Sequence, residues 1–252
     1  MATREYHPRD HCSFFDFGGP FPAHCVQGTK GSFLTDKIAG TMQPYLKEQE
    51  DRRFATPPET EETGGGDTPP PPPPPRDRMH VVYKGISKDI DSFGGFRYQE
   101  KGPWRERLAH NRCPCHGSFL EWTGAYTLYS STIGEDANAP PDVMSVLDKR
   151  RVLELLPVQE PSRVGRVFVC GLAYDFCVVD TAANYAALAR TKLGKDDDGD
   201  DYGPPDTYIV QNLTRAAHIP GLGTFGTGFL TDPAVMLGKL EKGPIGLVRF
   251  ED

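Results

Sequence analysis

Four potential metal ligands lie close together near the start of the sequence. The stretch "EYHPRDHCSFFDFGGPFPAHC" contains them, and they are Glu5, His7, His11 and His24. Imidazole and carboxylate groups are ordinary ligands for zinc, iron or manganese, and this set would leave coordination positions open for water or substrate. A polar surface loop with histidines by chance is the alternative, since the spacing is only moderately specific.

A lysine stands where a buried strand is expected to end. Lys84 closes the apolar run "HVVYK" and is followed by "GISKDIDSFGGF". An ammonium group at the carboxyl end of a buried strand is partly desolvated, so it needs an anionic partner or loses its proton. The alternative is a lysine whose stem packs on the strand while its charged end reaches water.

A cysteine occupies the expected start of a helix. Cys177 lies in "GLAYDFCVVDTAANYAAL", directly behind the apolar run "RVFVCGL". We expect Asp175 to cap the helix and leave Cys177 in its first turn, where free backbone N–H groups favour a thiolate and can hold an oxyanion. A small residue buried under the helix is the alternative, because cysteine is among the most buried residue types. Cys170 and the "CPCH" of Cys113, Cys115 and His116 lack such a setting. Metal binding by "CPCH" is an alternative, but because the stretch lacks the second half of a metal motif we interpret it as a loop.

The elements that must position these groups alternate along the chain. The stretches "MHVVYKG", "RVGRVFVCGL", "DTYIVQN" and "GLVRF" predict strands, since they are rich in β-branched or aromatic residues. Helical spacing follows Asp175, and "TDPAVMLGKLEKGP" predicts a second helix with Pro233 in its first turn and Gly243 at its stop. This order indicates an α/β fold, a mostly parallel sheet with helices on both faces, whose active site lies at the carboxyl ends of the strands.

Composition excludes several classes of protein. The 252 residues suit one domain, and the net charge of −7 comes without a basic stripe, so no nucleic-acid partner is expected. No apolar stretch reaches the roughly 20 residues of a membrane span, and the start has no signal core. Six irregularly spaced cysteines then favour reduced thiols and a cytoplasmic protein. Two stretches are of low complexity: one ends in the seven prolines Pro69 to Pro75, and "GKDDDGDDYGPPD" is an acidic loop that fails the EF-hand pattern.

Taken together, the motifs resemble the nicotinamidases of the isochorismatase-like cysteine hydrolases. The similarity rests on "HPRDHCSF", "GGPFPAHCVQGTKG", "VVYKG…DIDSFGGF" and "VFVCGLAYDFCVVDTAANYA", which occur in the family's order. It implies one hydrolase domain over residues 1–252, with a low-complexity insertion at about 55–78 and a peripheral insertion at about 97–150. It also implies hydrolysis of nicotinamide to nicotinate and ammonia in pyridine nucleotide salvage for NAD biosynthesis.

The resemblance assigns a role to each group. Cys177 would be the nucleophile, Lys84 its activating cation, and the backbone amides of Ala173 and Cys177 the oxyanion hole. The metal ligands would be Glu5, His7, His11 and His24, with zinc expected first and iron or manganese as alternatives. Three aromatic residues would wall the pyridine ring, and they are Phe21, Phe93 and Phe176.

The sequence departs from the family pattern at two points. The family's Asp-x-Gln-Asn-Asp-Phe type motif, whose first Asp is the general base, does not occur in the printed sequence. We therefore expect this chain to lack the first strand, the first helix and that Asp, as a fragment would, and a genuine short form to be poorly stable and nearly inactive. The second departure is Glu5, which stands where the family usually has Asp and which reaches one methylene further.

Two other functions stay open at this level. One is hydrolysis of a different amide on the same fold. The other is a non-catalytic interaction module that displays the polyproline segment to SH3- or WW-type partners. The sequence is compatible with a homo-oligomer but does not predict one.

Overall fold

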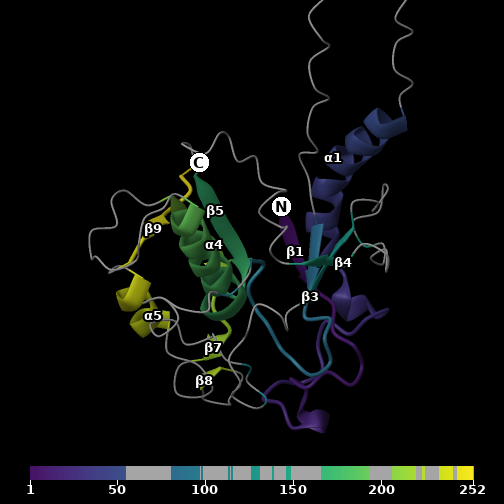
Figure 1. Ribbon diagram of the computed structural model, residues 1–252, viewed down its shortest axis with the longest axis horizontal. Coiled ribbons are helices and arrows are strands. Elements are labelled where there is room, and N and C mark those ends of the chain that lie inside the picture. Colours follow the sequence, from purple (N-terminus) through teal and green to yellow (C-terminus); the bar gives the residue numbers. More distant parts are fainter. Residues whose placement is uncertain are drawn as a thin grey trace, which may run out of the picture.

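The described part of the chain contains three separate sheets (Figure 1). The computed structural model describes residues 1–54, 81–96, 98, 113, 115, 126–130, 138, 146–148, 166–192, 206–219, 223–224, 233–240 and 243–251. The polyproline segment, the rest of the insertion at 55–78 and the acidic loop lie outside these residues, as does most of 97–150. Within the described ranges, no helix is long and apolar enough to cross a membrane.

The first sheet brings the N-terminal strand beside the strand that ends in Lys84. Its order is β1 (Ala2–Glu5), β2 (Val81–Lys84), β3 (Tyr126–Ser130) and β4 (Val146–Asp148). β1 and β2 are parallel, and their register sets Glu5 opposite Lys84 at the carboxyl ends of both strands. β3 and β4 continue the sheet in antiparallel fashion. Helix α1 (Asp36–Phe54) packs on this sheet through Met42 and Leu46.

The second sheet is entirely parallel and carries the helix that follows Cys177. Its order is β5 (Val167–Leu172), β6 (Thr207–Arg215) and β9 (Ile245–Val248). A π-helical turn (Tyr174–Val178) joins β5 to helix α4 (Val179–Lys192). The remaining elements are two 3-10 turns (Phe15–Phe17 and Lys30–Ser32), the small sheet of β7 (His218–Ile219) and β8 (Gly223–Thr224), and helix α5 (Pro233–Leu240).

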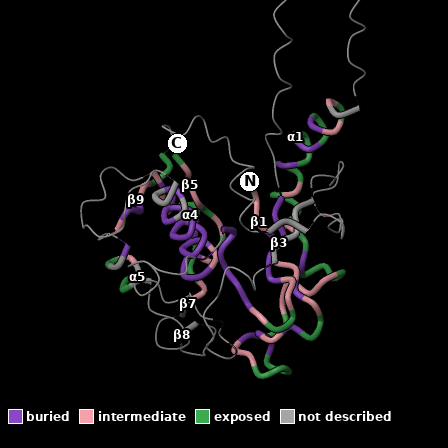
Figure 2. Tube along the Cα trace, in the orientation of Figure 1, coloured by how far each residue is buried: buried purple, intermediate pink, exposed green. Residues whose placement is uncertain are grey.

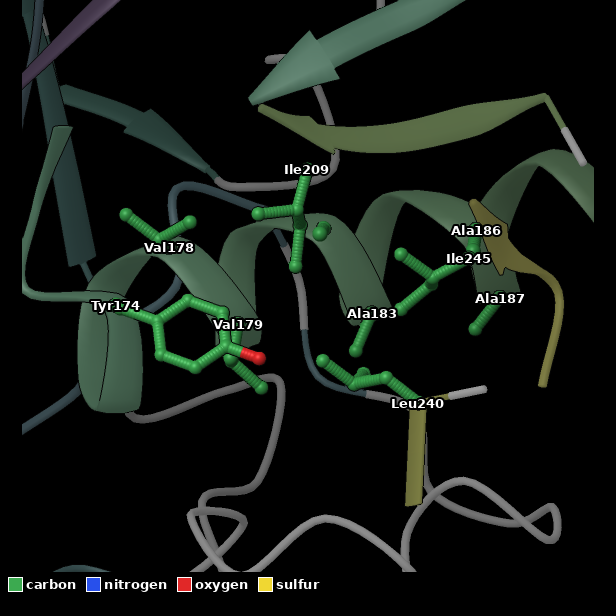
Figure 3. Packing of buried hydrophobic residues seen from close by; sticks show 10 residues of the cluster. Tyr174, Val178, Val179, Ala183, Ala186, Ala187, Ile209, Leu240 and Ile245 are labelled. Atoms are coloured by element: carbon green, nitrogen blue, oxygen red, sulfur yellow. The ribbon is translucent and has the colours of Figure 1, made fainter. Parts of the chain in front are cut away.

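The core under α4 is built from small residues on the helix and large ones around it. Ala182, Ala183 and Ala186 let the helix approach the sheet closely, and Ile209 and Leu240 fill the space against them, both with no exposed surface (Figure 3). The tube in Figure 2 is accordingly buried along most of α4. Since each fully buried aliphatic side chain contributes about 1.5–3 kcal/mol, this packing fixes the position of the π-helical turn.

The α/β class and the four predicted strands are confirmed, and Pro233 does begin α5. The sheet differs from the expectation, because the described strands form two larger sheets instead of one. Among the described strands β5 pairs on one side only, and its Phe168 and Leu172 remain 58% and 73% exposed. The stretch at 97–150, expected to be peripheral, supplies β3 and β4, the last two strands of the first sheet.

Candidate active site

The cysteine expected at a helix start lies in the π-helical turn between β5 and α4. The turn begins after Ala173, which makes no side-chain capping bond. The expectation that Asp175 caps the helix is therefore wrong. Its side chain is fully buried in the wider turn and accepts a hydrogen bond from the backbone N–H of Ala217 at 2.8 Å. This contact ties the turn that carries Cys177 to the residues after β6.

Three ionisable side chains meet at the carboxyl ends of β1, β2 and β5. The Lys84 Nζ atom lies 3.2 Å from Cys177 Sγ and 2.5 Å from Glu5 Oε1. Cys177 Sγ in turn donates toward Glu5 Oε1 at 3.4 Å. Lys84 is only 1% exposed, so it is not a lysine that reaches water, and it has the anionic partner that its burial requires. The sequence places these residues up to 172 positions apart, and the carboxyl ends of the parallel strands β1 and β2 and of β5 bring them together.

Burial and neighbouring charges shift the pKa of each member of this triad, which consists of Lys84, Glu5 and Cys177. Burial alone would lower the pKa of Lys84, but Cys177 and Glu5 outweigh burial and raise that pKa above its usual value. Burial would raise the pKa of Glu5, but Lys84 together with hydrogen bonds from His24 and His7 holds it well below its usual value. Burial, followed by the charge of Glu5, raises the pKa of the Cys177 thiol to about 12 despite the opposing effect of Lys84. The resting site is thus an ammonium–carboxylate pair beside a protonated thiol, and the thiolate expected from the sequence is not favoured.

The second carboxylate oxygen of Glu5 faces imidazoles. Glu5 Oε2 lies 3.2 Å from His7 Nε2 and 3.5 Å from His24 Nε2. His7 Nδ1 donates to the carbonyl of Gly85 at 2.8 Å, and His24 Nδ1 donates to that of Pro22 at 2.8 Å. Because Nδ1 of each ring contacts a carbonyl oxygen, Nε2 is the atom directed at Glu5 Oε2, and it is also the atom that could ligate a metal.

His11 belongs to a second, overlapping set of donors. His7, His11 and Asp91 each have a ligand atom within 4.8 Å of the others, as do Glu5, His7 and His24. Burial and the neighbouring His7 lower the pKa of His11 to about 3, so its ring is neutral. Burial and Glu5 raise the pKa of Asp91 to about 6. His7 belongs to both sets. The four ligands expected from the sequence, together with Asp91, therefore form two overlapping groups of three.

Unsatisfied buried atoms indicate that these residues fit a cation. His11 Nε2 and Asp91 Oδ1 are buried and make no hydrogen bond of ordinary geometry within the described part of the chain. A buried carboxylate oxygen without a donor is costly, and a divalent cation would satisfy it. Gly85 keeps space for the site: its φ is +68°, and a Cβ there would lie 2.6 Å from His7 Nδ1. Asp91 lies within "DIDSFGGF", where the sequence gives no reason to single it out, since one Asp in a polar stretch carries no distinguishing signal.

A pocket of about 390 Å³ opens beside the triad. Its lining includes Glu5, Lys84, Ala173 and Cys177. The three aromatic residues expected at a ring site also line it, and they are Phe21, Phe93 and Phe176. The ring centroid of Phe176 lies 5.6 Å from that of Phe21 and 5.2 Å from that of Phe93, in inclined arrangements. The volume is in the range of small-molecule sites, and its walls join apolar surface to a few charged groups.

Comparison by sequence found no known protein that matches the chain, whereas comparison by structure found similar folds. No protein-family model and no curated protein matches the sequence. Among solved structures, the chain resembles PnC1 from L. infantum in complex with nicotinate, with 20% identity and a TM-score of 0.44 over 98% of this chain and 70% of that one. It also resembles the pyrazinamidase of Pyrococcus horikoshii in complex with zinc, with 19% identity and a TM-score of 0.42 over 99% of this chain and 74% of that one. A third similar structure is an Acinetobacter baumanii nicotinamidase/pyrazinamidase, with 14% identity and a TM-score of 0.42 over 98% of this chain and 75% of that one. At such identities and TM-scores they assign no substrate or site to this chain, for which its own residues must be the evidence.

Proposed function

We propose that the chain is a metal-assisted nicotinamidase, which hydrolyses nicotinamide to nicotinate and ammonia through a cysteine thioester. One observation carries the proposal: Cys177 Sγ, Lys84 Nζ and Glu5 Oε1 lie within 3.4 Å of one another at a pocket walled by three phenylalanines. A nucleophile, a buried cation and a carboxylate in contact are what attack on a poorly electrophilic amide requires.

Glu5 takes the part of the general base in this mechanism. Cys177 Sγ attacks the carboxamide carbon while its proton passes to Glu5 Oε1, and Lys84 stabilises the charge on sulfur. The backbone N–H groups of Ala173 and Cys177 would hold the oxyanion of the tetrahedral intermediate. When the C–N bond breaks, the proton on Glu5 goes to the departing nitrogen, and ammonia leaves.

Water then cleaves the thioester. Glu5, ionised again, accepts a proton from the water that attacks the acyl carbon. The C–S bond then breaks, Glu5 returns that proton to Cys177 Sγ, and the acid leaves as nicotinate after losing its own proton to solvent. The base that the sequence appeared to lack would thus be supplied by the residue expected only to bind metal. Its two oxygens are directed differently, with Oε1 toward Lys84 and Cys177 and Oε2 toward His7 and His24.

The imidazole cluster would hold the metal. Glu5, His7 and His24 form one set of ligands, with His11 and Asp91 beside them, and their nitrogen and oxygen donors suit zinc, iron or manganese. When bound, such an ion is a Lewis acid that can coordinate the ring nitrogen and polarise water. Phe21, Phe93 and Phe176 would hold the flat ring, which restricts substrates to planar aromatic amides.

The test is ammonia release from nicotinamide by the full chain with zinc, compared with Cys177→Ala and with Cys170→Ser. Cys170 is an exposed cysteine outside the pocket, so its variant should keep wild-type activity. Cys177→Ala should abolish ammonia release. Equal release by both variants would exclude the nucleophile, and a wild-type preference for a carbamoyl amide over nicotinamide and pyrazinamide would exclude the substrate class.

A further inference from the structure

A second cluster of potential metal ligands lies outside the pocket. The sulfur of Cys12 lies 2.7 Å from that of Cys115 and 3.9 Å from that of Cys113. All three sulfur atoms are within 4.8 Å of one another, and none of the three residues lines the pocket beside Cys177. In the sequence alone, the "CPCH" stretch lacks the second pair of ligands, the other half that a metal-binding motif needs. The fold supplies that half as Cys12, about a hundred positions earlier in the chain.

The surroundings of the cluster suit bound thiolates. Cys113 is 1% exposed, and Cys12 and Cys115 are half-buried beside Tyr98 and Ile90. The backbone N–H of Asp91 donates to Cys113 Sγ at 3.4 Å. A backbone donor of this kind satisfies and orients a sulfur ligand from the second coordination sphere.

We propose that Cys12, Cys113 and Cys115 bind a thiophilic divalent cation of the zinc class in a structural site. Zinc–sulfur bonds of about 2.3 Å in tetrahedral geometry separate sulfur atoms by about 3.8 Å. The 3.9 Å between Cys12 and Cys113 already matches this edge, and Cys115 needs to move by about 1 Å to match it from Cys12. A disulfide would join two of the sulfurs at about 2.05 Å and leave the third unused, whereas one cation engages all three.

The site would brace the loop that carries the histidines. Cys12 follows His11 directly, and its backbone N–H donates to the carbonyl of Lys88 at 2.7 Å. Ser13, the next residue, contacts His11 Nδ1 through its hydroxyl at 2.7 Å. A cation held by Cys12, Cys113 and Cys115 would therefore tie Cys113 and Cys115 to the residues beside His11 and Asp91. This gives these two cysteines a role in positioning the histidine loop.

Cobalt(II) is the probe that tests this site independently of any amidase activity. The full chain, carrying Cys177→Ala and Cys25→Ser so that neither thiol lining the pocket can contribute, is stripped with a chelator under reducing conditions and titrated with Co²⁺. A thiolate-to-cobalt charge-transfer band in the near ultraviolet is expected, since imidazole and carboxylate ligands do not produce one. Adding Cys113→Ser should remove the band and lower bound zinc by one equivalent, whereas adding Cys170→Ser, at an exposed cysteine, should change neither. Absence of the band, or its persistence in Cys113→Ser, overturns the proposal.

Thiol counting in the unmodified chain provides a test that does not depend on how the variants fold. With zinc added, three thiols should be protected from a thiol reagent, and a chelator should expose them. If a reductant exposes two thiols and a chelator exposes none, the cluster is a disulfide and the proposed cation site is wrong. If all thiols react at once with zinc present, there is neither, and the proposal fails.

Discussion

Replacing Glu5 by Gln should speed up the alkylation of Cys177 and slow down the hydrolysis of nicotinamide. The change keeps the size of the side chain and removes its negative charge. At the 3.4 Å between Glu5 Oε1 and Cys177 Sγ, two unit charges interact by about 5 kcal/mol at an effective dielectric constant of about 20. The attraction of Lys84, 3.2 Å from the same sulfur, is of about the same size and opposite sign. The two nearly cancel, which leaves burial to raise the pKa of Cys177 to about 12.

In Glu5→Gln the attraction of Lys84 is no longer balanced. At about 1.4 kcal/mol per pKa unit, the pKa of Cys177 should fall by up to about 3.5 units, and the thiolate fraction at pH 8 should then rise by on the order of 10³-fold. Alkylation by iodoacetamide from pH 7 to 10, on chelator-treated protein, measures this. Hydrolysis of nicotinamide at saturating zinc should instead fall by about 10²–10⁴-fold, the usual contribution of a general base.

The matched control is Glu48→Gln, which removes an exposed carboxylate on α1 and should leave both rates at the wild-type level. Zinc affinity is measured separately, because Glu5 also faces His7 and His24. The reasoning is refuted if alkylation of Glu5→Gln is slower than that of the wild type, since the carboxylate would then not hold the proton on sulfur. Unchanged hydrolysis would remove Glu5 from the mechanism.

Three further changes test the site and the core. Lys84→Met removes the cation that opposes Glu5, so both hydrolysis and Cys177 alkylation should fall, the first by at least about 100-fold; a faster alkylation would contradict the assigned charges. Gly85→Ala puts a Cβ against the His7 ring at a positive φ, so zinc affinity and thermal stability should both drop, and an unchanged zinc affinity by calorimetry would show that His7 can move. Ile209→Ala empties a fully buried position under α4 and should lower the free energy of unfolding, measured by denaturant titration, by about 2–5 kcal/mol. The control Val235→Ala changes an exposed residue and should alter that free energy by less than about 0.5 kcal/mol. If the two variants lose equal stability, the packing around Ile209 does not hold α4 in place.

Local patterns predicted much of the secondary structure. The runs that became β2, β5, β6 and β9 are rich in β-branched or aromatic residues, and this local propensity favours strands whether or not the strand is fully buried. The alanine-rich helix after Cys177 likewise follows from local spacing, and its small residues pack in the core with residues of β6 and β9. The π-helical turn could not be predicted, because it depends on Asp175 binding Ala217 across the fold instead of capping the helix.

The sequence by itself determined which groups can do chemistry. It singled out Cys177, Lys84 and the histidines, because their types and their places at strand ends follow from local pattern and motif. Only the tertiary structure decided which of them touch. It directed one oxygen of Glu5 to Lys84 and Cys177, added Asp91 to His7 and His11, and joined Cys12 to Cys113. These contacts span up to 172 positions, and no local pattern encodes them: they depend on strand register and on how one buried carboxylate finds partners for both of its oxygens.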